Sequence, residues 1–285
     1  MRPIVRPKKI YISRDIFNKM SSSDILKFFP VKLYKYFVIN ENTINTLKYS
    51  NLWYSSPKYF NDPFDCKINV NFGNNKKDIL QNIETSLNDE SLSKFFKNYL
   101  LKNINKKKDC NFWLNQTFNY FFDKNVGICC FSQFPDIPLM WSNYANSHTG
   151  ICMIFETKYF INKKNIDDKY LLSVDYYKSY PTLNLCKYKN NKFKRILLAM
   201  LLAKYEDWSY ECEWRSIILE GGNRLYPFPK KMLKGIIFGI NTTDKTKKII
   251  KDIIKKRYYD IIYYQAKMSN TAYKIIIHKE KCNGT

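Results

Sequence analysis

The apolar residues of this chain come in short runs, and their length limits what the chain can fold into. The longest run, residues 196–203, is far shorter than the roughly 20 residues that a membrane-spanning helix needs. No apolar segment follows the basic start, residues 1–9, so a secretion signal is not indicated. We therefore expect a soluble protein with no membrane contact.

Short runs rich in aromatic and β-branched residues predict strands, and wider apolar spacing predicts helices between them. The predicted strands cover residues 33–38, 52–56, 126–132, 151–155, 171–177, 213–219, 235–240, 260–264 and 272–278. The predicted helices include a short one after Asn40 or Asn42 and longer ones at 136–148, 191–206 and 244–256. This irregular alternation favours an α+β domain with a mixed or antiparallel sheet over a doubly wound one.

The domain organisation follows from changes in composition. Residues 1–30 are a basic lead-in that ends in a short helix, and residues 31–285 form a single α+β domain of catalytic type. A polar stretch at about 75–124, rich in Lys, Asn and Asp, interrupts this domain. Its apolar spacing predicts a helical insertion.

The chain is strongly basic, with 48 Lys and Arg against 25 Asp and Glu and a formal net charge of +23. A charge of this sign attracts phosphates and nucleic acid and argues against a basic substrate. Codon bias toward Lys and Asn would produce the same composition, with the lysines dispersed on solvated helices. The charge alone therefore leaves both interpretations open.

The eight cysteines are scattered, and the chain has only two histidines. Zinc sites use Cys and His in close pairs, and disulfide frameworks are typical of small secreted chains. We therefore predict reduced, mostly buried cysteines, no metal site, and a cytoplasmic protein.

The segment 208–219, WSYECEWRSIIL, carries the most distinctive chemistry. A strand beginning near Glu211 would place Glu211, Glu213 and Arg215 on one face at a sheet edge, because side chains alternate along a strand. Two neighbouring carboxylates suit glycosidic chemistry, in which one stabilises a positively charged sugar and the other activates an acceptor. The alternative is a surface ladder of ion pairs.

Two further segments carry candidate residues. Along the helix at 136–148, Trp141, Tyr144 and His148 fall on one side; such a stripe belongs either to a site or to the core. After Ser55 and Ser56, the sequence Asn-Asp-Pro-Phe-Asp at 61–65 predicts a polar turn, with or without a binding role.

Several motifs in fixed order resemble those of an uncharacterised bacterial family of unknown function, whose members usually read NDPFE, CFS, MWSHYA and EWR. The matching segments here are LYKY at 33–36, LWYSSP at 52–57, FNDPFD at 60–65, CFS at 130–132, MWSNYA at 140–145, Gly150 and YECEWR at 210–215. The resemblance covers residues 33–278 apart from the insertion. It implies no reaction.

The order of the motifs is also similar to that of the ADP-ribosyltransferase superfamily, which includes toxins that modify nucleic acids. This resemblance implies a split sheet and NAD as substrate. It implies that Glu213 contacts the nicotinamide ribose, that Glu211 is the preceding acid, and that Ser55 or Ser56 is the serine of the second motif. Lys35 or Tyr36 stands where that superfamily has His or Arg, and Lys35 is the main departure from the pattern.

The residues agree with this resemblance. Lys35 and Arg215 would line a basic cleft for the pyrophosphate of NAD, with Asn61 and Asp62 nearby. Nicotinamide would stack on Trp141, Tyr144 or Tyr36.

Three hypotheses about the function remain open. The leading hypothesis is an NAD-consuming ADP-ribosyltransferase-like toxin or phage-defence effector, which needs no metal. Its acceptor would be a nucleic acid or a protein, and an antitoxin or a defence-system component would be a further partner. The second is a metal-independent nuclease or nucleic-acid-binding effector that uses Lys35, His148 and the basic helix at 247–256. The third is a non-catalytic interaction module in which Glu213 and Arg215 form a structural pair.

Overall fold

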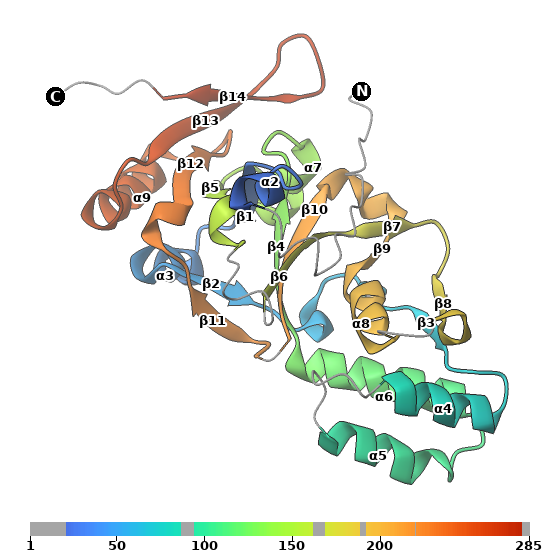
Figure 1. Cartoon of the computed structure of the whole chain (residues 1–285). Coiled ribbons are helices and arrows are strands. Elements are labelled where there is room, and N and C mark those ends of the chain that lie inside the picture. Colours follow the sequence, from blue (N-terminus) through green and yellow to red (C-terminus); the bar gives the residue numbers. More distant parts are fainter. Residues whose placement is uncertain (1–20, 87–93, 162–168, 189–191, 220, 281–285) are drawn as a thin grey trace. The chain divides into compact units, whose positions relative to one another are not determined.

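The computed structural model of the chain describes residues 21–86, 94–161, 169–188, 192–219 and 221–280 (Figure 1). They fold into two compact units. The first contains the described residues within 21–55, 127–173 and 209–280, and the second contains those within 56–126 and 174–208. The predicted lead-in lies mostly outside the described residues, as does Cys282. Its described part includes the short helix α2 (Ser22–Leu26), which Ser21 caps.

The first unit is built on a large mixed sheet, which confirms the predicted α+β class. In sheet order its eight strands are β14 (Ile275–Lys279), β13 (Ile262–Met268), β12 (Leu233–Phe238), β5 (Ile151–Glu156), β1 (Lys32–Phe37), β4 (Gly127–Ser132), β10 (Glu213–Ile218) and β6 (Lys169–Ser173). All neighbouring strands are antiparallel except β12 and β13, which are parallel.

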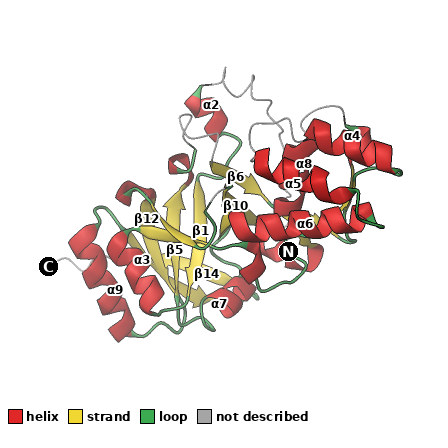
Figure 2. Ribbon diagram, turned by 90° about the horizontal axis from the view of Figure 1, so that it is seen from below, coloured by secondary structure: helices red, strands yellow, loops and turns green. Residues whose placement is uncertain are grey.

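Helices cover both faces of this sheet (Figure 2). The helices α3 (Glu41–Tyr49) and α9 (Asp244–Arg257) pack on one face, where Ile250 and Ile254 of α9 join the larger apolar core. The helix α7 (Pro138–Tyr144) packs on the other face, and its Trp141 belongs to a second core. The two faces therefore bury separate cores.

The sheet opens between β1 and β4. These strands form a single residue pair, Tyr34 with Ser132. Beyond it, the ammonium group of Lys35 donates to the carbonyl oxygen of Cys130 at 2.9 Å. Ser55, which follows β2 (Asn51–Tyr54), forms a backbone bridge with Ile128 of β4. A separate antiparallel ribbon joins β2 to β11 (Arg224–Pro227).

The second unit is mainly helical. Its helices are α4 (Lys76–Ser86), α5 (Lys94–Ile104), α6 (Cys110–Asn125) and α8 (Lys192–Leu202). Its strands form two short parallel ribbons: β3 (Asn69–Asn71) with β8 (Thr182–Asn184), and β7 (Asp175–Tyr177) with β9 (Ala203–Tyr205). The predicted helices at 75–124 are confirmed within the described residues, and they belong to a unit that extends beyond the predicted insertion.

Several predicted elements have different bounds in the structure, and three of them differ for a reason that the structure shows. The strand predicted at 171–177 is divided between β6 and β7, which belong to different sheets. The helix predicted at 191–206 gives way to β9 after Leu202, because pairing with β7 overrides helix propensity there. The helix predicted at 136–148 ends at Tyr144, because residues 146–148 have left-handed φ angles of 46–67°.

Within the described ranges, the chain has no helix of the length and apolar character that a membrane crossing requires. The same residues include no group of three His, Cys, Asp or Glu side chains placed to share a metal ion.

Candidate functional site

Glu213 and Arg215 lie on β10, in the interior of the sheet. This strand pairs with β4 on one side and with β6 on the other. The prediction of a sheet edge is therefore wrong, because β6 covers the side of β10 that was expected to be open. Burial follows from this position: Glu213 is 4% exposed and Arg215 is fully buried.

The two side chains form a bidentate ion pair. Arg215 donates from Nε to Oε1 of Glu213 at 2.8 Å and from Nη2 to Oε2 at 3.2 Å. They meet because residues two apart on a strand share a face. The alternative of a surface ion-pair ladder is also wrong, since both groups are buried. Removing one partner from such a buried pair would leave an uncompensated charge in the protein interior.

Glu211 lies outside the strand. It ends a 3-10 helix, η5 (Glu206–Glu211), and Cys212, with a left-handed φ of 45°, separates it from β10. The predicted alternation from Glu211 onward is therefore interrupted. The Glu211 carboxylate is 3% exposed and accepts a hydrogen bond of 2.6 Å from the Tyr144 hydroxyl. The structure thus places both predicted acids at the start of β10, with different partners.

A row of polar side chains crosses the sheet beside these acids. Tyr34 pairs with Ser132, and Ser132 pairs with Glu213, so the three lie on one face. The Ser132 hydroxyl donates to the main-chain oxygen of Glu211 at 2.7 Å. Tyr34 is half-buried, and loss of solvation raises its pKa to about 12.

The candidate list from the sequence left out Tyr34 and Ser132. Both stood within recognised motifs, the LYKY and CFS segments. Strand alternation could have placed each of them on the face of Glu213, provided that the order of the three strands was known.

Two of the aromatic candidates are core residues. Trp141 is fully buried, and its indole Nε1 donates to the carbonyl oxygen of Pro135 at 2.7 Å. Its ring and that of Tyr36 are nearly perpendicular, with centroids 5.1 Å apart. The Tyr36 hydroxyl donates to the carbonyl oxygen of Phe134. The prediction that nicotinamide stacks on Trp141 or Tyr36 is therefore wrong for this structure. Tyr144 is only partly buried and remains a candidate.

Lys35 and Arg215 do not line one cleft. Lys35 alternates with Tyr34 and Tyr36, so its side chain lies on the opposite face of the sheet from Glu213 and Arg215. Its ammonium group lies 5.6–5.7 Å from the ring centroids of Phe37 and Phe131. This contact and its bond to Cys130 indicate a structural role at the opening between β1 and β4.

The serine and turn candidates fall into both units. Ser55 belongs to the first, where its backbone bridges to β4. Ser56 belongs to the second; it is fully buried, and its hydroxyl donates to the carbonyl oxygen of Asp123. Asn61 is exposed, and Asp62 accepts from the amide of Phe64 at 2.9 Å, which confirms the predicted turn.

The turn also holds a buried ion pair of the second unit. Asp65, its last residue, lies 3.4 Å from the ammonium group of Lys204, and both side chains are almost fully buried. The prediction of mostly buried, reduced cysteines also agrees with the described ones: Cys66, Cys110, Cys129 and Cys152 are buried, and no described cysteine forms a disulfide.

The residues proposed for a nuclease are not assembled into one site. His148 stacks on Trp141, with ring centroids 6.4 Å apart, on the face of the sheet that carries α7. Lys35 lies on the opposite face. Partial burial lowers the pKa of His148, which favours the neutral ring.

These features define an α+β domain with two buried carboxylates at the start of an interior strand. Residues 140–216 match a family model described as a protein of unknown function, DUF2971. Over these residues the chain is similar to this domain of unknown function, and the expected resemblance to an uncharacterised domain family is confirmed over the MWSNYA and YECEWR motifs. No curated protein and no solved structure matches the chain.

Proposed function

We propose that this protein consumes NAD by an ADP-ribosyltransferase-like reaction, as a toxin or phage-defence effector. The observation that carries the proposal is the burial of two carboxylates, Glu211 and Glu213, at the start of β10. Each carboxylate has a fixed partner, Tyr144 for the first and Arg215 for the second. Carboxylates held in place before the reaction stabilise a developing positive charge at the smallest reorganisation cost.

The proposed reaction breaks the bond between nicotinamide and ribose. Nicotinamide leaves with the bonding electron pair, and positive charge develops on the ribose. Glu213, which Arg215 holds in position, stabilises that charge. An acceptor nucleophile then bonds to the ribose, and its proton passes to Glu211.

The row of polar side chains formed by Tyr34, Ser132 and Glu213 supports a position for the ligand on the face of the sheet that these three residues share. Tyr34 is only partly buried, and its ring is the first stacking partner that we propose for nicotinamide. Tyr144 offers the second partly exposed ring. These two replace Trp141 and Tyr36 in the proposed site.

Nicotinamide release is the direct test. Purified protein is incubated with NAD labelled in the nicotinamide ring, together with cell extract as the source of acceptors, and free nicotinamide is measured. The wild-type protein should release it, and Glu213→Gln should abolish the release. A wild-type protein that releases none would contradict the enzymatic proposal.

A loss of activity in Glu213→Gln must be distinguished from a loss of folding. Glu156→Gln is a matched control, because Glu156 is also a strand carboxylate held by ion pairs, with Lys158 at 2.8 Å and Lys234 at 3.3 Å. This control should keep nicotinamide release. Circular dichroism and the melting temperature of each variant show whether the loss in Glu213→Gln occurs in folded protein.

The non-catalytic module is the second candidate, and the burial of Arg215 with Glu213 favours it. In that case Glu213→Gln lowers stability, and neither wild type nor variant releases nicotinamide. The same experiment therefore separates the two functions.

A further inference from the structure

The outer face of α9 gathers basic side chains. Four lysines, Lys245, Lys248, Lys255 and Lys256, are exposed and lie on this face, where Asp244, Ile249 and Asp252 are also exposed. Within the described part of the chain, none of these four lysines forms an ion pair with a carboxylate. They span about 16 Å along the helix, at a rise of about 1.5 Å per residue.

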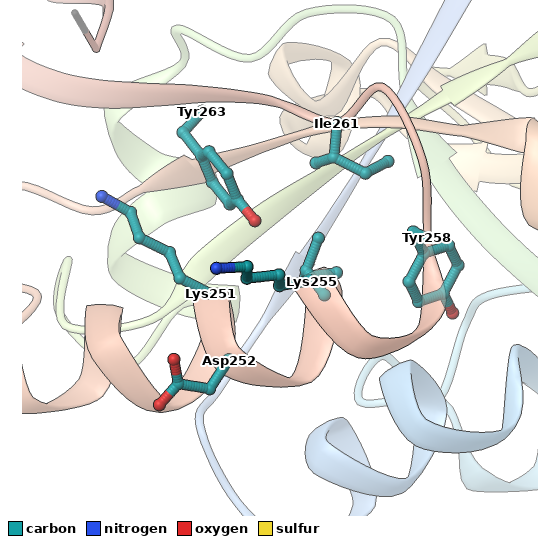
Figure 3. A pocket seen from close by; sticks show the side chains of 7 residues that line it. Lys251, Asp252, Lys255, Tyr258, Ile261 and Tyr263 are labelled. Carbon is teal, nitrogen blue, oxygen red and sulfur yellow. The ribbon is translucent and has the colours of Figure 1, made fainter. Parts of the chain in front are cut away.

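A hollow borders this basic face (Figure 3). It has a volume of about 290 Å³ and lies between α9 and the start of β13. Its lining residues are Lys251, Asp252, Ile254, Lys255, Tyr258, Ile261 and Tyr263. Figure 3 shows the Tyr263 hydroxyl pointing toward the Lys255 side chain. The size is at the lower end of small-ligand sites and suits a single nucleobase or sugar.

The two lysines of the hollow have different roles. Lys251 pairs with Glu280 at 2.6 Å and lies 5.2 Å from the centre of the Tyr263 ring, so its charge is already compensated. Lys255 has no carboxylate partner among the described residues and belongs both to the basic face and to the hollow. It can therefore bind a phosphate while the adjoining base or sugar enters the hollow.

We propose that α9 and this hollow bind single-stranded nucleic acid. The lysines contact successive phosphates, and one unstacked nucleotide inserts between Tyr263 and Ile261. A base held in a duplex cannot enter such a hollow, so the site prefers single strands. This proposal concerns a surface outside the NAD site and holds whether or not the protein consumes NAD.

The packing of α9 argues against a membrane as the partner. A helix that binds a lipid surface inserts its apolar face between the lipids. In α9 that face is buried in the protein core through Ile250 and Ile254. The face that remains exposed carries four lysines, and it complements a polyanion.

The test measures binding of a fluorescent oligonucleotide of about 12 nucleotides, within the range of known single-strand sites. The variant replaces three lysines of the α9 face: Lys248→Gln, Lys255→Gln and Lys256→Gln. Counterion release contributes about 0.7 to the salt slope per phosphate contact. The variant should therefore bind about 100-fold more weakly at 0.1 M salt, with a slope reduced by about two.

The charge-matched control replaces Lys102, Lys106 and Lys108 with Gln, because these residues are exposed in the second unit. It should bind like the wild type. Equal weakening in both triple variants would overturn the proposal, since binding would then follow total charge. RNA and DNA of one sequence, tested in parallel, identify which strand the site prefers.

A second variant tests the hollow without changing charge. Ile261→Phe fills part of the hollow and should reduce the preference for single strands over a duplex of the same sequence, at an unchanged salt slope. Its melting temperature is measured first, to establish that it folds. Tighter wild-type binding to the duplex than to the single strand would overturn the proposal.

Discussion

Arg215 holds both carboxylate oxygens of Glu213 from a position two residues along the same interior strand. This arrangement uses the shortest spacing at which two strand residues share a face. It places a charged pair where β10 is covered on both sides by neighbouring strands. The pair therefore fixes the start of β10, and with it the position of the carboxylate that we propose for catalysis.

Arg215→Met should destabilise the protein strongly. The variant leaves Glu213 buried without its cationic partner, and breaking a buried pair in this way typically costs about 3–5 kcal/mol. The free energy of unfolding, measured by urea titration with tryptophan fluorescence, reports the change.

The double variant Glu213→Leu, Arg215→Met is the control for this loss. Replacing both partners by apolar residues removes the uncompensated charge and should recover most of the stability. A double variant as unstable as the single one would show that packing, and not the charge, accounts for the loss.

Tyr144→Phe should separate the roles of the two acids. It removes a hydrogen bond of 2.6 Å to the Glu211 carboxylate, and bonds to charged groups contribute about 1.5–3 kcal/mol. If Glu211 receives the acceptor proton, labelling of the acceptor should fall more than nicotinamide release. Tyr49→Phe, at an exposed tyrosine of α3, should leave both rates and the unfolding free energy unchanged.

The sequence predicted the presence of a strand better than it predicted that strand's neighbours. The aromatic and β-branched residues at 33–38 correctly indicated β1, because strand propensity is a local property. The burial of β10 depends on its pairing with β6, which begins more than 40 residues earlier in the chain. No local pattern indicates such a long-range pairing. The sequence therefore predicts an edge position for Glu213, although the strand lies in the interior of the sheet.

The position of Glu211 outside the strand also could not be predicted, and the reason is a local one. The left-handed residue that separates it from β10 is Cys212, with a φ of 45°. Glycine, asparagine and aspartate commonly mark such positions, and cysteine does not. For Trp141, by contrast, the helical spacing already allowed a core position as an alternative, and burial decided in favour of the core.

Asn115→Leu should destabilise the second unit. The Asn115 side chain accepts from the amide of Val70 and donates to its carbonyl oxygen, both at 2.8 Å, in place of a strand neighbour. Each backbone group left without a partner costs about 1–3 kcal/mol. Gln116→Leu, on the exposed side of the same helix, is the matched control and should change the urea midpoint little.

Stability should decline at alkaline pH because of buried tyrosines. Burial raises the pKa of Tyr34 from 10.0 to about 12, so the fold favours its neutral form. Its contribution is complete below pH 10 and is lost as pH rises from 10 through 12, where only the unfolded chain ionises readily. In Tyr34→Phe the unfolding free energy should fall less steeply over this interval. Tyr259→Phe, at an 87% exposed tyrosine, should follow the wild type.

Gly150→Ala should destabilise the start of β5. A Cβ atom there would lie 2.1 Å from the carbonyl oxygen of Phe37 and 2.9 Å from that of Ala145. Backbone atoms cannot move aside as a flexible side chain can, so the strain should reach or exceed the roughly 1–3 kcal/mol typical of overpacking. Gly127→Ala is the comparison, because its nearest neighbours, the Cβ of Tyr54 and backbone atoms of Gly221 and Gly222, would lie farther away, at 3.1–3.2 Å. We expect a clearly larger fall in melting temperature for Gly150→Ala; equal falls would contradict the close approach of these backbone segments.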